Sequence, residues 1–358
     1  MLHQMTRIGI DCRFASGLGG LGTYTRELVT ALVARNDPWT YVLFVSSPDK
    51  VWHQHLSCEK IVVPYRHYTL SEQIFLPGLY RASHIDVLFA PHFSTPLLSR
   101  IPTVCTIHDL ILHHYPNQAS LIKRIAYRML FAHAVNHSAH ILSVSEATKT
   151  DLMAAYPSLR SEKVTVAYPG VSPLFHPADT AMVDQAKAQY GLTKPYFLYV
   201  GNCKQHKNVP LLLSAFQSLQ SLDTELILVT SGKEADHLSL PAGVRILRDM
   251  SFASLPALYT GAIACVTASL FEGFGLPVIE AMACGCPVIA PNRTSIPEVS
   301  CGKATLLEPT SEAFAAAMRH HMAAPCDRQV LAQGWHERYD WKKTAQKTAA
   351  IFARMIES

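Results

Sequence analysis

The chain has 358 residues, of which 49% are hydrophobic and 16% charged, and its formal net charge is +4. A single hydrophobic core stops growing below this length, so we expect two domains. The excess positive charge lies in the first half. It is too small for a nucleic-acid-binding surface, but it suits a phosphate-bearing acceptor or an anionic membrane surface.

The apolar runs are short, and the nine cysteines are scattered. No run is long enough for a membrane-spanning helix, and residues 1–14 lack the apolar core of a signal peptide. The cysteines include no C-x2-C pair, which argues against a zinc site and for reduced, buried thiols. The sequence therefore predicts a cytoplasmic α/β protein.

The first predicted strand, residues 7–14, runs into the glycine-rich segment G-L-G-G-L-G, residues 17–22, and a helix over 23–35. Gly17, Gly19 and Gly22 match the dinucleotide-binding pattern G-x-G-x-x-G. A nicotinamide dinucleotide site also needs an acidic residue at the end of the second strand. Here Asp37 precedes that strand, predicted over 41–46, so a dehydrogenase is a weak alternative.

Alternating strands and helices continue through the first half. The further strands are expected at 61–63, 87–90, 103–108, 141–144 and 164–170, with helices at 71–81 and 147–156. His108 ends one of these strands. Parallel α/β sheets bind ligands at the carboxyl ends of their strands, so His108 is a candidate ligand-contacting residue. The alternative is a core histidine whose hydrogen bonds are satisfied internally.

A helix is also predicted over 121–137, where Lys123, Arg124 and Arg128 stand among apolar residues. Basic amphipathic helices of this kind can lie on anionic membranes. The alternative, which we expect here, is an ordinary domain helix with a solvated basic face.

The second half opens with a strand over 196–201, followed by N-C-K-Q-H-K-N, residues 202–208. Lys207, in a loop before a helix, is a suitable point charge for a diphosphate. Further strands are predicted at 225–230 and 244–247.

Residues 262–290 predict a strand over 262–266, a glycine turn, a helix opened by Pro277 and ended by Gly285, and a strand over 286–290. The free N–H groups and the dipole of a helix that follows a glycine turn favour a diphosphate. Glu272 and Glu280 can accept hydrogen bonds from sugar hydroxyls. The alternative is a packing turn with two solvated glutamates.

The run E-G-F-G-L-P-V-I-E-A-M-A-C-G-C-P-V-I-A, residues 272–290, resembles the E-x7-E signature of the retaining GT-B glycosyltransferases of family 4. G-G-L-G-T-Y (19–24) and S-I-P-E-V (295–299) also resemble motifs of that family. The resemblance implies two Rossmann-like domains that face each other across a central cleft. We expect an acceptor-side domain at 1–175, a nucleotide-sugar domain at 176–340, and a helix at 341–358 that returns to the first domain.

By the same resemblance, His108, Glu272 and Lys207 are expected to be catalytic. Asn202 and His206 stand where many members carry arginine, so the diphosphate would depend mainly on Lys207. The segment 248–251 and the helix from residue 255 would edge the nucleobase pocket. The remaining donor-binding positions would be Gly20, Gly22, Asn202, Lys204, Gly273, Phe274, Gly275, Leu276 and Glu280.

The pattern N-x-K-x-H-K-N is similar to that of a subset of the family that includes mannosyltransferases. The implied donor is GDP-mannose, with a UDP-hexose as the alternative. The chain has no D-x-D triplet, and we expect no divalent metal. The expected acceptor is a glycan or a lipid-linked glycan of a bacterial surface polysaccharide, reached from the inner face of the cell membrane. A catalytically silent sugar-nucleotide-binding subunit remains an alternative.

Overall fold

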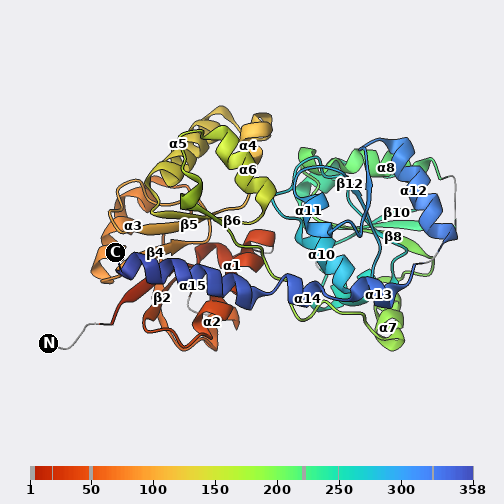
Figure 1. The fold of residues 1–358 in the computed structure, drawn as a ribbon. Coiled ribbons are helices and arrows are strands. Elements are labelled where there is room, and N and C mark those ends of the chain that lie inside the picture. Colours follow the sequence, from red (N-terminus) through yellow and green to blue (C-terminus); the bar gives the residue numbers. More distant parts are fainter. Residues whose placement is uncertain are drawn as a thin grey trace. The chain divides into compact units, whose positions relative to one another are not determined.

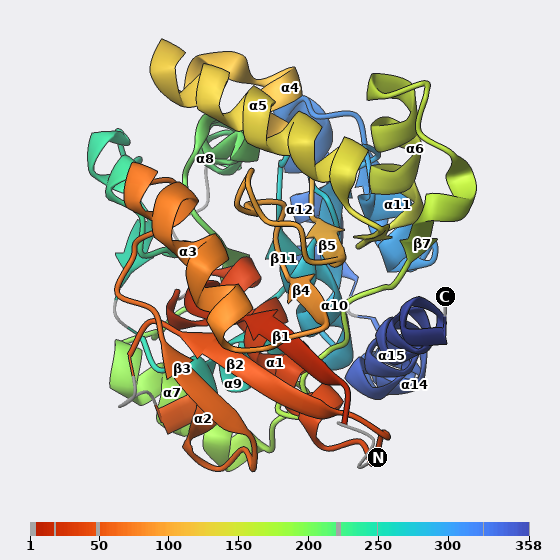
Figure 2. The same ribbon diagram turned by 90° about the vertical axis from the view of Figure 1, so that its left-hand side faces the viewer.

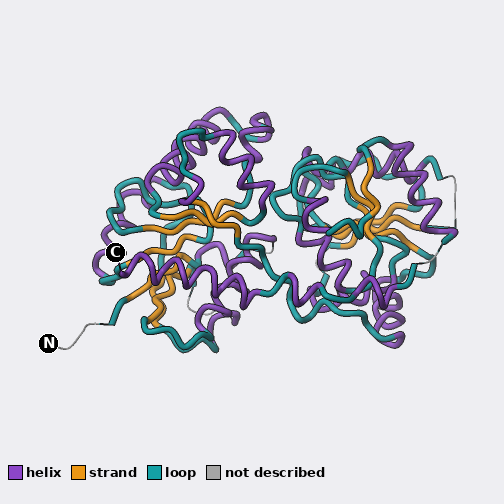
Figure 3. Tube along the Cα trace, in the orientation of Figure 1, coloured by secondary structure: helices purple, strands orange, loops and turns teal. Residues whose placement is uncertain are grey.

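The computed structural model describes residues 5–17, 19–47, 51–219, 223–248, 250–324 and 326–357. Leu18 of the glycine-rich segment and Asp249 of the expected nucleobase loop lie outside these residues. Contacts along the chain divide it into two compact units. Unit 1 comprises residues 1–170 and 339–358, and unit 2 comprises residues 171–338. In Figure 3 each unit has a central band of strands with helices around it.

Unit 1 contains a seven-stranded parallel sheet with the order β3-β2-β1-β4-β5-β6-β7, of which β3, β2 and β1 lie side by side in Figure 2. Its strands are near-continuous apolar runs because both faces of a parallel sheet are covered. The strand order reverses between β1 and β4, where such sheets bind ligands. The strands are β1 (Arg7–Asp11), β2 (Thr40–Val45), β3 (Glu59–Val62), β4 (Val87–Ala90), β5 (Thr103–Ile107), β6 (His140–Ser143) and β7 (Val164–Val166).

Helices cover this sheet, and the last of them comes from the far end of the chain. The α-helices of unit 1 are α1 (Gly20–Val33), α2 (Val51–Gln54), α3 (Leu70–Ala82), α4 (Ile111–His114), α5 (Leu121–His137), α6 (Glu146–Ala155) and α15 (Trp341–Glu357). The described residues of unit 1 also form the 3-10 turns η1 (Arg13–Ser16), η2 (Pro116–Gln118) and η3 (Ser161–Lys163).

Helix α15 packs along α1 (Figure 1). The Thr344 hydroxyl donates to the carbonyl oxygen of Tyr168 at 2.5 Å. A Cβ atom added to Gly170 would lie 2.4 Å from the backbone nitrogen of Trp341, so only glycine allows this close approach. These contacts tie α15 to the last residues of the continuous part of unit 1.

Unit 2 contains a six-stranded parallel sheet with the order β10-β9-β8-β11-β12-β13, which reverses between β8 and β11. Its strands are β8 (Tyr196–Val200), β9 (Glu225–Val229), β10 (Val244–Leu247), β11 (Cys265–Val266), β12 (Val288–Pro291) and β13 (Thr305–Leu307). Its α-helices are α7 (Thr180–Tyr190), α8 (Val209–Gln217), α9 (Leu255–Gly261), α10 (Leu276–Ala283), α11 (Ile296–Ser300), α12 (Ser311–Ala323), α13 (Arg328–Ala332) and α14 (Trp335–Arg338). The 3-10 turns are η4 (Gln205–Lys207), η5 (Lys233–His237) and η6 (Phe252–Ser254).

The predicted α/β class with two parallel-sheet, Rossmann-like domains is confirmed. Most elements lie within two residues of their predicted ends, and four differ more. The strand predicted over 7–14 ends at Asp11, because Arg13–Ser16 form the 3-10 turn η1. Helix α1 begins at Gly20, three residues before the predicted start, because its first turn is built from the glycine-rich segment itself. Strand β7 ends at Val166, and the residues after it turn toward α15.

The strand predicted over 262–266 is reduced to Cys265–Val266. Helix α9 extends to Gly261, and the N–H of Ala262 still donates to the Tyr259 carbonyl oxygen at 3.2 Å. The guanidinium of Arg328 donates to the Ala262 carbonyl oxygen at 2.5 Å. These two partners occupy the backbone groups of Ala262. Hydrogen bonds to β8 continue through the Ile263 N–H, at 2.7 Å from the Tyr196 carbonyl oxygen, and the Ala264 carbonyl oxygen, at 3.0 Å from the Leu198 nitrogen.

Candidate functional site

An ion pair lies beyond the carboxyl end of β8 in unit 2. Lys207 ends η4, and its Nζ atom lies 2.5 Å from Oε1 of Glu272. Their side chains are 18% and 16% exposed. The structure therefore joins two predicted catalytic residues that stand 65 positions apart in the chain.

Hydrogen bonds from two other segments fix the loop that carries Glu272. The N–H of Leu270 donates to the His206 carbonyl oxygen at 2.7 Å. The N–H of Glu272 donates to Oγ1 of Thr294 at 3.0 Å. The Ser295 hydroxyl lies 3.0 Å from the carbonyl oxygens of Glu272 and Phe274, to which it donates. The loop is thus held in one conformation before any ligand binds, which favours binding.

Helix α10 follows this loop as the sequence predicted. Gly275 is its N-cap with φ of 95°, Pro277 lies in its first turn, and Gly285 follows its end with φ of 70°. The first turn of a helix presents N–H groups and a partial positive charge. The predicted donor-binding positions Gly273, Phe274, Gly275 and Leu276 all lie at this end of α10.

Glu280 lies in the second turn of α10 and is only 7% exposed. The Tyr259 hydroxyl donates to its Oε2 atom at 3.3 Å. Burial raises the pKa of Glu280 to about 7, and the hydrogen bond from Tyr259 opposes this rise. Together with the ion pair of Glu272, this burial excludes the alternative of two solvated glutamates.

The other predicted positions of this segment differ in exposure. Lys204 is exposed, and its N–H donates to Oδ1 of Asn202 at 3.2 Å. His206 is buried, and burial together with the charge of Lys207 lowers its pKa to about 4. Its imidazole is therefore neutral at neutral pH, and Lys207 supplies the positive charge next to Glu272.

The glycine positions of unit 1 form the start of α1. Gly20 and Gly22 lie in its first turn, behind the N-cap Gly19. A Cβ atom on Gly22 would lie 2.0 Å from the carbonyl oxygen of Gly17, so a side chain there would force the loop apart. Arg26 closes the loop by donating to the same oxygen at 2.9 Å.

His108 follows β5, at the carboxyl edge of the sheet, as predicted. Its Nε2 atom lies 2.8 Å from the carbonyl oxygen of Pro91. Burial lowers the pKa of His108 to about 4, so the neutral ring donates from Nε2 and keeps an acceptor lone pair on Nδ1. The internal bond satisfies one ring nitrogen, as in the core-histidine alternative, while the strand-end position agrees with the ligand-contact prediction.

Sequence reasoning did not predict several contacts that shape these sites, although it had named the segments of Ser295 and Tyr259. Thr294 and Ser295 hold the Glu272 loop, and Tyr259 contacts Glu280. Ser295 belongs to a recognised motif, but its hydroxyl bonds join segments more than twenty residues apart, and neither spacing nor periodicity indicates them.

Three further observations bear on the alternatives. Asp37 lies before β2 and binds Arg35 at 2.8 Å, so it does not supply the acidic residue expected of a dehydrogenase. Among the described residues, no group of three or more His, Cys, Asp or Glu side chains is placed to hold a metal ion. Within the same residues, no helix combines the length and the apolar character needed to cross a bilayer.

Two family models match the chain in succession. The model for Glycosyltransferase Family 4 matches residues 18–173, and the model for Glycosyl transferases group 1 matches residues 183–347. The chain is 30% identical over 253 residues to the O-antigen chain mannosyltransferase RfbU of Salmonella typhimurium, covering 68% of this chain and 67% of that protein. It is 31% identical over 228 residues to O-antigen chain mannosyltransferase B of Escherichia coli, covering 60% of this chain and 58% of that protein.

Solved structures share the fold over nearly the whole chain. The sucrose-phosphate synthase of Thermosynechococcus elongatus has a TM-score of 0.77 at 21% identity, covering 98% of this chain and 99% of that one. Anabaena HepE, in complex with UDP and glucose, has a TM-score of 0.76 at 18% identity, and the match covers 98% of this chain and 100% of that one. The chain belongs to the family 4 glycosyltransferases and has their GT-B fold.

Proposed function

We propose that the protein is a retaining mannosyltransferase that transfers mannose from GDP-mannose to a glycan or lipid-linked acceptor of a bacterial surface polysaccharide. The observation that carries the proposal is the Lys207–Glu272 pair beside the N-terminus of α10. Its positive groups suit a diphosphate, and its carboxylate suits sugar hydroxyls. The choice of mannose is supported by the two relatives described as O-antigen chain mannosyltransferases.

In this proposal, donor binding breaks the ion pair between Lys207 and Glu272, and each side chain then binds a different part of the donor. Lys207 turns from Glu272 to the diphosphate, and the freed carboxylate accepts hydrogen bonds from the hexose hydroxyls. The backbone N–H groups at the start of α10 add positive potential where negative charge develops on the leaving group. Glu280 accepts from the ribose hydroxyls. In unit 1, Nδ1 of the neutral His108 accepts from a hydroxyl of the transferred sugar.

The proposed reaction breaks the bond between the anomeric carbon and the diphosphate oxygen. The acceptor oxygen bonds to the same carbon with retention of configuration, and the released diphosphate takes the acceptor's hydroxyl proton. Neither glutamate acts as a covalent nucleophile. Lys207 and the N-terminus of α10 supply the positive charge, so we propose that no divalent metal is required.

A thermal-shift screen in the presence of EDTA tests the donor and the metal independence together. The ligands are GDP-mannose, GDP, UDP-glucose, UDP-N-acetylglucosamine, UDP and NAD. A ligand that binds only the folded protein raises its melting temperature. We expect a shift with GDP-mannose and GDP that is the same without EDTA.

Other outcomes of the screen point to the alternatives. A shift with the UDP compounds alone would replace the donor by a UDP-hexose, as bound in Anabaena HepE. A shift that disappears with EDTA would contradict metal independence. Binding of GDP-mannose without transfer to any mannosylated acceptor would favour a silent sugar-nucleotide-binding subunit, and a shift with NAD would favour the dehydrogenase alternative.

We further propose that α5 holds the protein at the inner face of the membrane, in place of the ordinary domain helix expected from the sequence. Its 17 residues include no acidic side chain, and Lys123 and Arg128 are exposed on it. Buried residues such as Phe131 occupy one side of the helix. Exposed apolar residues occupy the opposite side: Leu121, Ile122, Ile125 and Met129. An apolar stripe with basic neighbours suits the surface of an anionic bilayer.

Replacing Ile122, which is 81% exposed, by aspartate should weaken binding to vesicles of phosphatidylglycerol and phosphatidylcholine. The substitution places a negative charge in the stripe, and the exposed site makes a folding defect unexpected. Co-sedimentation measures the effect. Val330→Asp, at a 58% exposed position of unit 2, is the matched control and should bind as the unmodified protein does. Equal binding to pure phosphatidylcholine would contradict the electrostatic part of the proposal.

A further inference from the structure

Tyr68 has a backbone conformation that is unusual for a large side chain. It lies between β3 and α3, has φ of 61°, and is 53% exposed. Bulky residues rarely adopt this left-handed conformation, and residues that do so cluster at ligand sites. Because half of the residue is exposed, packing of the ring into the core does not account for its conformation.

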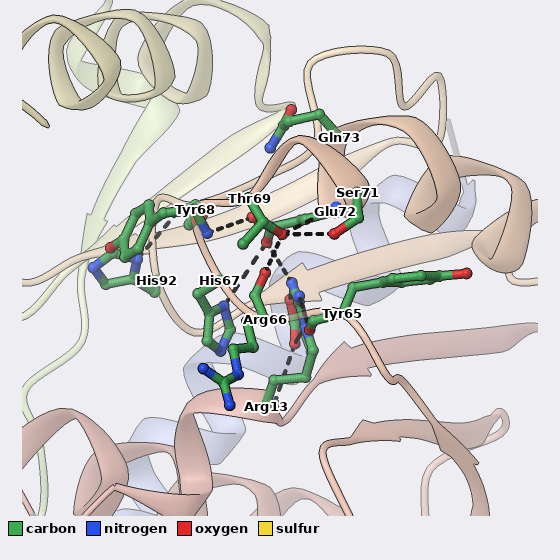
Figure 4. A network of polar contacts seen from close by, with 12 residues as sticks. Arg13, Tyr65, Arg66, His67, Tyr68, Thr69, Ser71, Glu72, Gln73 and His92 are labelled. Carbon is green, nitrogen blue, oxygen red and sulfur yellow. Dashed lines mark hydrogen bonds and ion pairs between the residues drawn. The ribbon is translucent and has the colours of Figure 1, made fainter. Parts of the chain in front are cut away.

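A buried carboxylate holds Tyr68 in this conformation (Figure 4). The N–H of Tyr68 donates to Oε2 of Glu72 at 2.7 Å. The other oxygen of Glu72, Oε1, accepts from Nη2 of Arg13 at 2.7 Å. Glu72 is fully buried, so the backbone of Tyr68 is fixed from inside unit 1.

Arg13 extends this support to β1 and to the start of the loop. Its guanidinium binds both carboxylate oxygens of Asp11, at 2.8 and 2.6 Å. Its Nη1 atom donates to the Tyr65 carbonyl oxygen at 3.3 Å. Burying such a charged cluster costs desolvation energy, and such clusters are weak contributors to stability. Here the cluster fixes both ends of the loop that presents Tyr68.

The ring of Tyr68 stands among other rings at the carboxyl edge of the sheet. Its centroid lies 6.2 Å from that of His92, at an interplanar angle of 82° (Figure 4). The rings of His67 and Phe14 stack with their centroids 3.5 Å apart, and the centroids of the Phe14 and His92 rings lie 4.6 Å apart. His92 follows β4 and Phe14 follows β1, so these rings flank the point where the strand order reverses. Ligands of open parallel sheets bind at this point.

Two buried polar atoms in this cluster make no hydrogen bond with the described residues. They are Nδ1 and Nε2 of His67. Nδ1 faces the carboxylate of Glu72, whose Oε1 atom lies 3.8 Å away in an ion-pair contact, so Nε2 is the ring nitrogen left without a partner among the described residues. Buried polar atoms are normally satisfied, so a ligand hydroxyl is a reasonable partner for this ring.

We propose that Tyr68, His67 and His92 bind a sugar ring of the acceptor. The C–H face of a pyranose packs on the exposed phenol ring, and its hydroxyls bond to the Nε2 atoms of the two imidazoles. The Nδ1 atoms are held by the protein, that of His92 by the Ser94 N–H at 3.2 Å and that of His67 by Glu72. The fixed orientation of Tyr68 lowers the entropy lost on binding, since the ring is already in place. This assignment rests on the proposed function, because it makes the site the acceptor subsite of a glycosyltransferase.

Saturation-transfer NMR on the full chain tests the subsite without turnover. The probes are the methyl α-glycosides of mannose, glucose and galactose, with GDP-mannose observed separately. Tyr68→Gly removes the ring, and glycine adopts the left-handed conformation without strain, so this variant is expected to fold. Tyr68→Phe keeps the ring. His84→Gly is the matched control, since His84 is an exposed residue of unit 1 with φ of 51° and lies after α3, away from the ring cluster.

We expect saturation of the ring protons of at least one glycoside with the unmodified protein, Tyr68→Phe and His84→Gly, and its loss with Tyr68→Gly. Unchanged saturation with Tyr68→Gly would overturn the assignment, and so would the absence of saturation from all three glycosides with the unmodified protein. If Tyr68→Gly instead abolished saturation transfer to GDP-mannose, Tyr68 would belong to the donor site and the acceptor assignment would be wrong. The donor thermal shift, measured on the same preparation, reports separately whether the proposed function fails.

Discussion

Lys207→Ala is expected to lower kcat about 100- to 1000-fold, the range found when one preorganised donor to a developing negative charge is removed. Lys207 is the side chain placed beside Glu272 and the glycine turn of α10, and the neighbouring His206 is neutral. In the variant the leaving diphosphate would lose the cation beside Glu272 and would depend mainly on backbone N–H groups. The melting temperature should fall as well, because the largely buried Glu272 loses its partner, but the loss of kcat should be the larger effect.

Steady-state kinetics with GDP-mannose and a mannosylated acceptor measure this effect. Lys194→Ala is the matched control, because Lys194 is an exposed lysine of unit 2 that precedes β8 and lies at the opposite edge of the sheet from Lys207. Its removal should leave kcat nearly unchanged. Lys207→Arg retains the positive charge on a planar guanidinium and should therefore be more active than Lys207→Ala but less active than the unmodified protein. A large drop in melting temperature with normal kcat would show that Lys207 is a structural residue.

Glu280→Gln is expected to weaken donor binding by about 1–3 kcal/mol, or roughly 5- to 150-fold in Kd. The ribose hydroxyls would lose a charged acceptor, while the side chain keeps its volume in the buried second turn of α10. Calorimetric titration with GDP-mannose measures the change. An unchanged Kd would remove Glu280 from the donor site.

The pH dependence gives a second readout for Glu280. Ribose hydroxyls donate to the ionised carboxylate, so donor affinity should rise as the pH increases through about 7, the pKa of Glu280. The Glu280→Gln variant should not show this rise.

The stability of the protein without ligand should change in the opposite direction. Because the pKa in the folded state lies above the usual 4.5, Glu280 lowers stability as the pH rises from 4.5 through 7. Glu280→Gln should therefore raise the melting temperature more at pH 8 than at pH 5.

Local patterns predicted the elements whose ends depend on their own residues. Helix α5 has its predicted bounds, and Pro277 and Gly285 mark the ends of α10. The strand at 262–266 was overestimated at its start, where the Ala262 carbonyl oxygen is bound by Arg328, a partner more than sixty residues away. The sequence near residue 262 does not indicate that a distant side chain bonds to its backbone, because the apolar residues typical of a strand continue through the whole segment.

The site residues were predicted by resemblance more than by physical pattern. Lys207 and Glu272 are each reasonable ligands on local grounds, but their pairing depends on the fold. Arg13 and Glu72 meet across 59 positions, and a buried pair of this kind has no periodicity that a sequence would show. The left-handed conformation of Tyr68 was also beyond sequence reasoning, because glycine and asparagine are the residues that indicate it.

The packing of α15 on α1 has a consequence for synthesis of the protein on the ribosome. Unit 2, residues 171–338, is complete before α15 emerges, whereas unit 1 receives its last helix only afterwards. Until then the side of unit 1 that receives Phe352 and Ile351 remains uncovered. Exposed apolar surface of this kind attracts chaperones and promotes aggregation. Unit 2, encoded later, is thus the first of the two units to have all of its residues outside the ribosome.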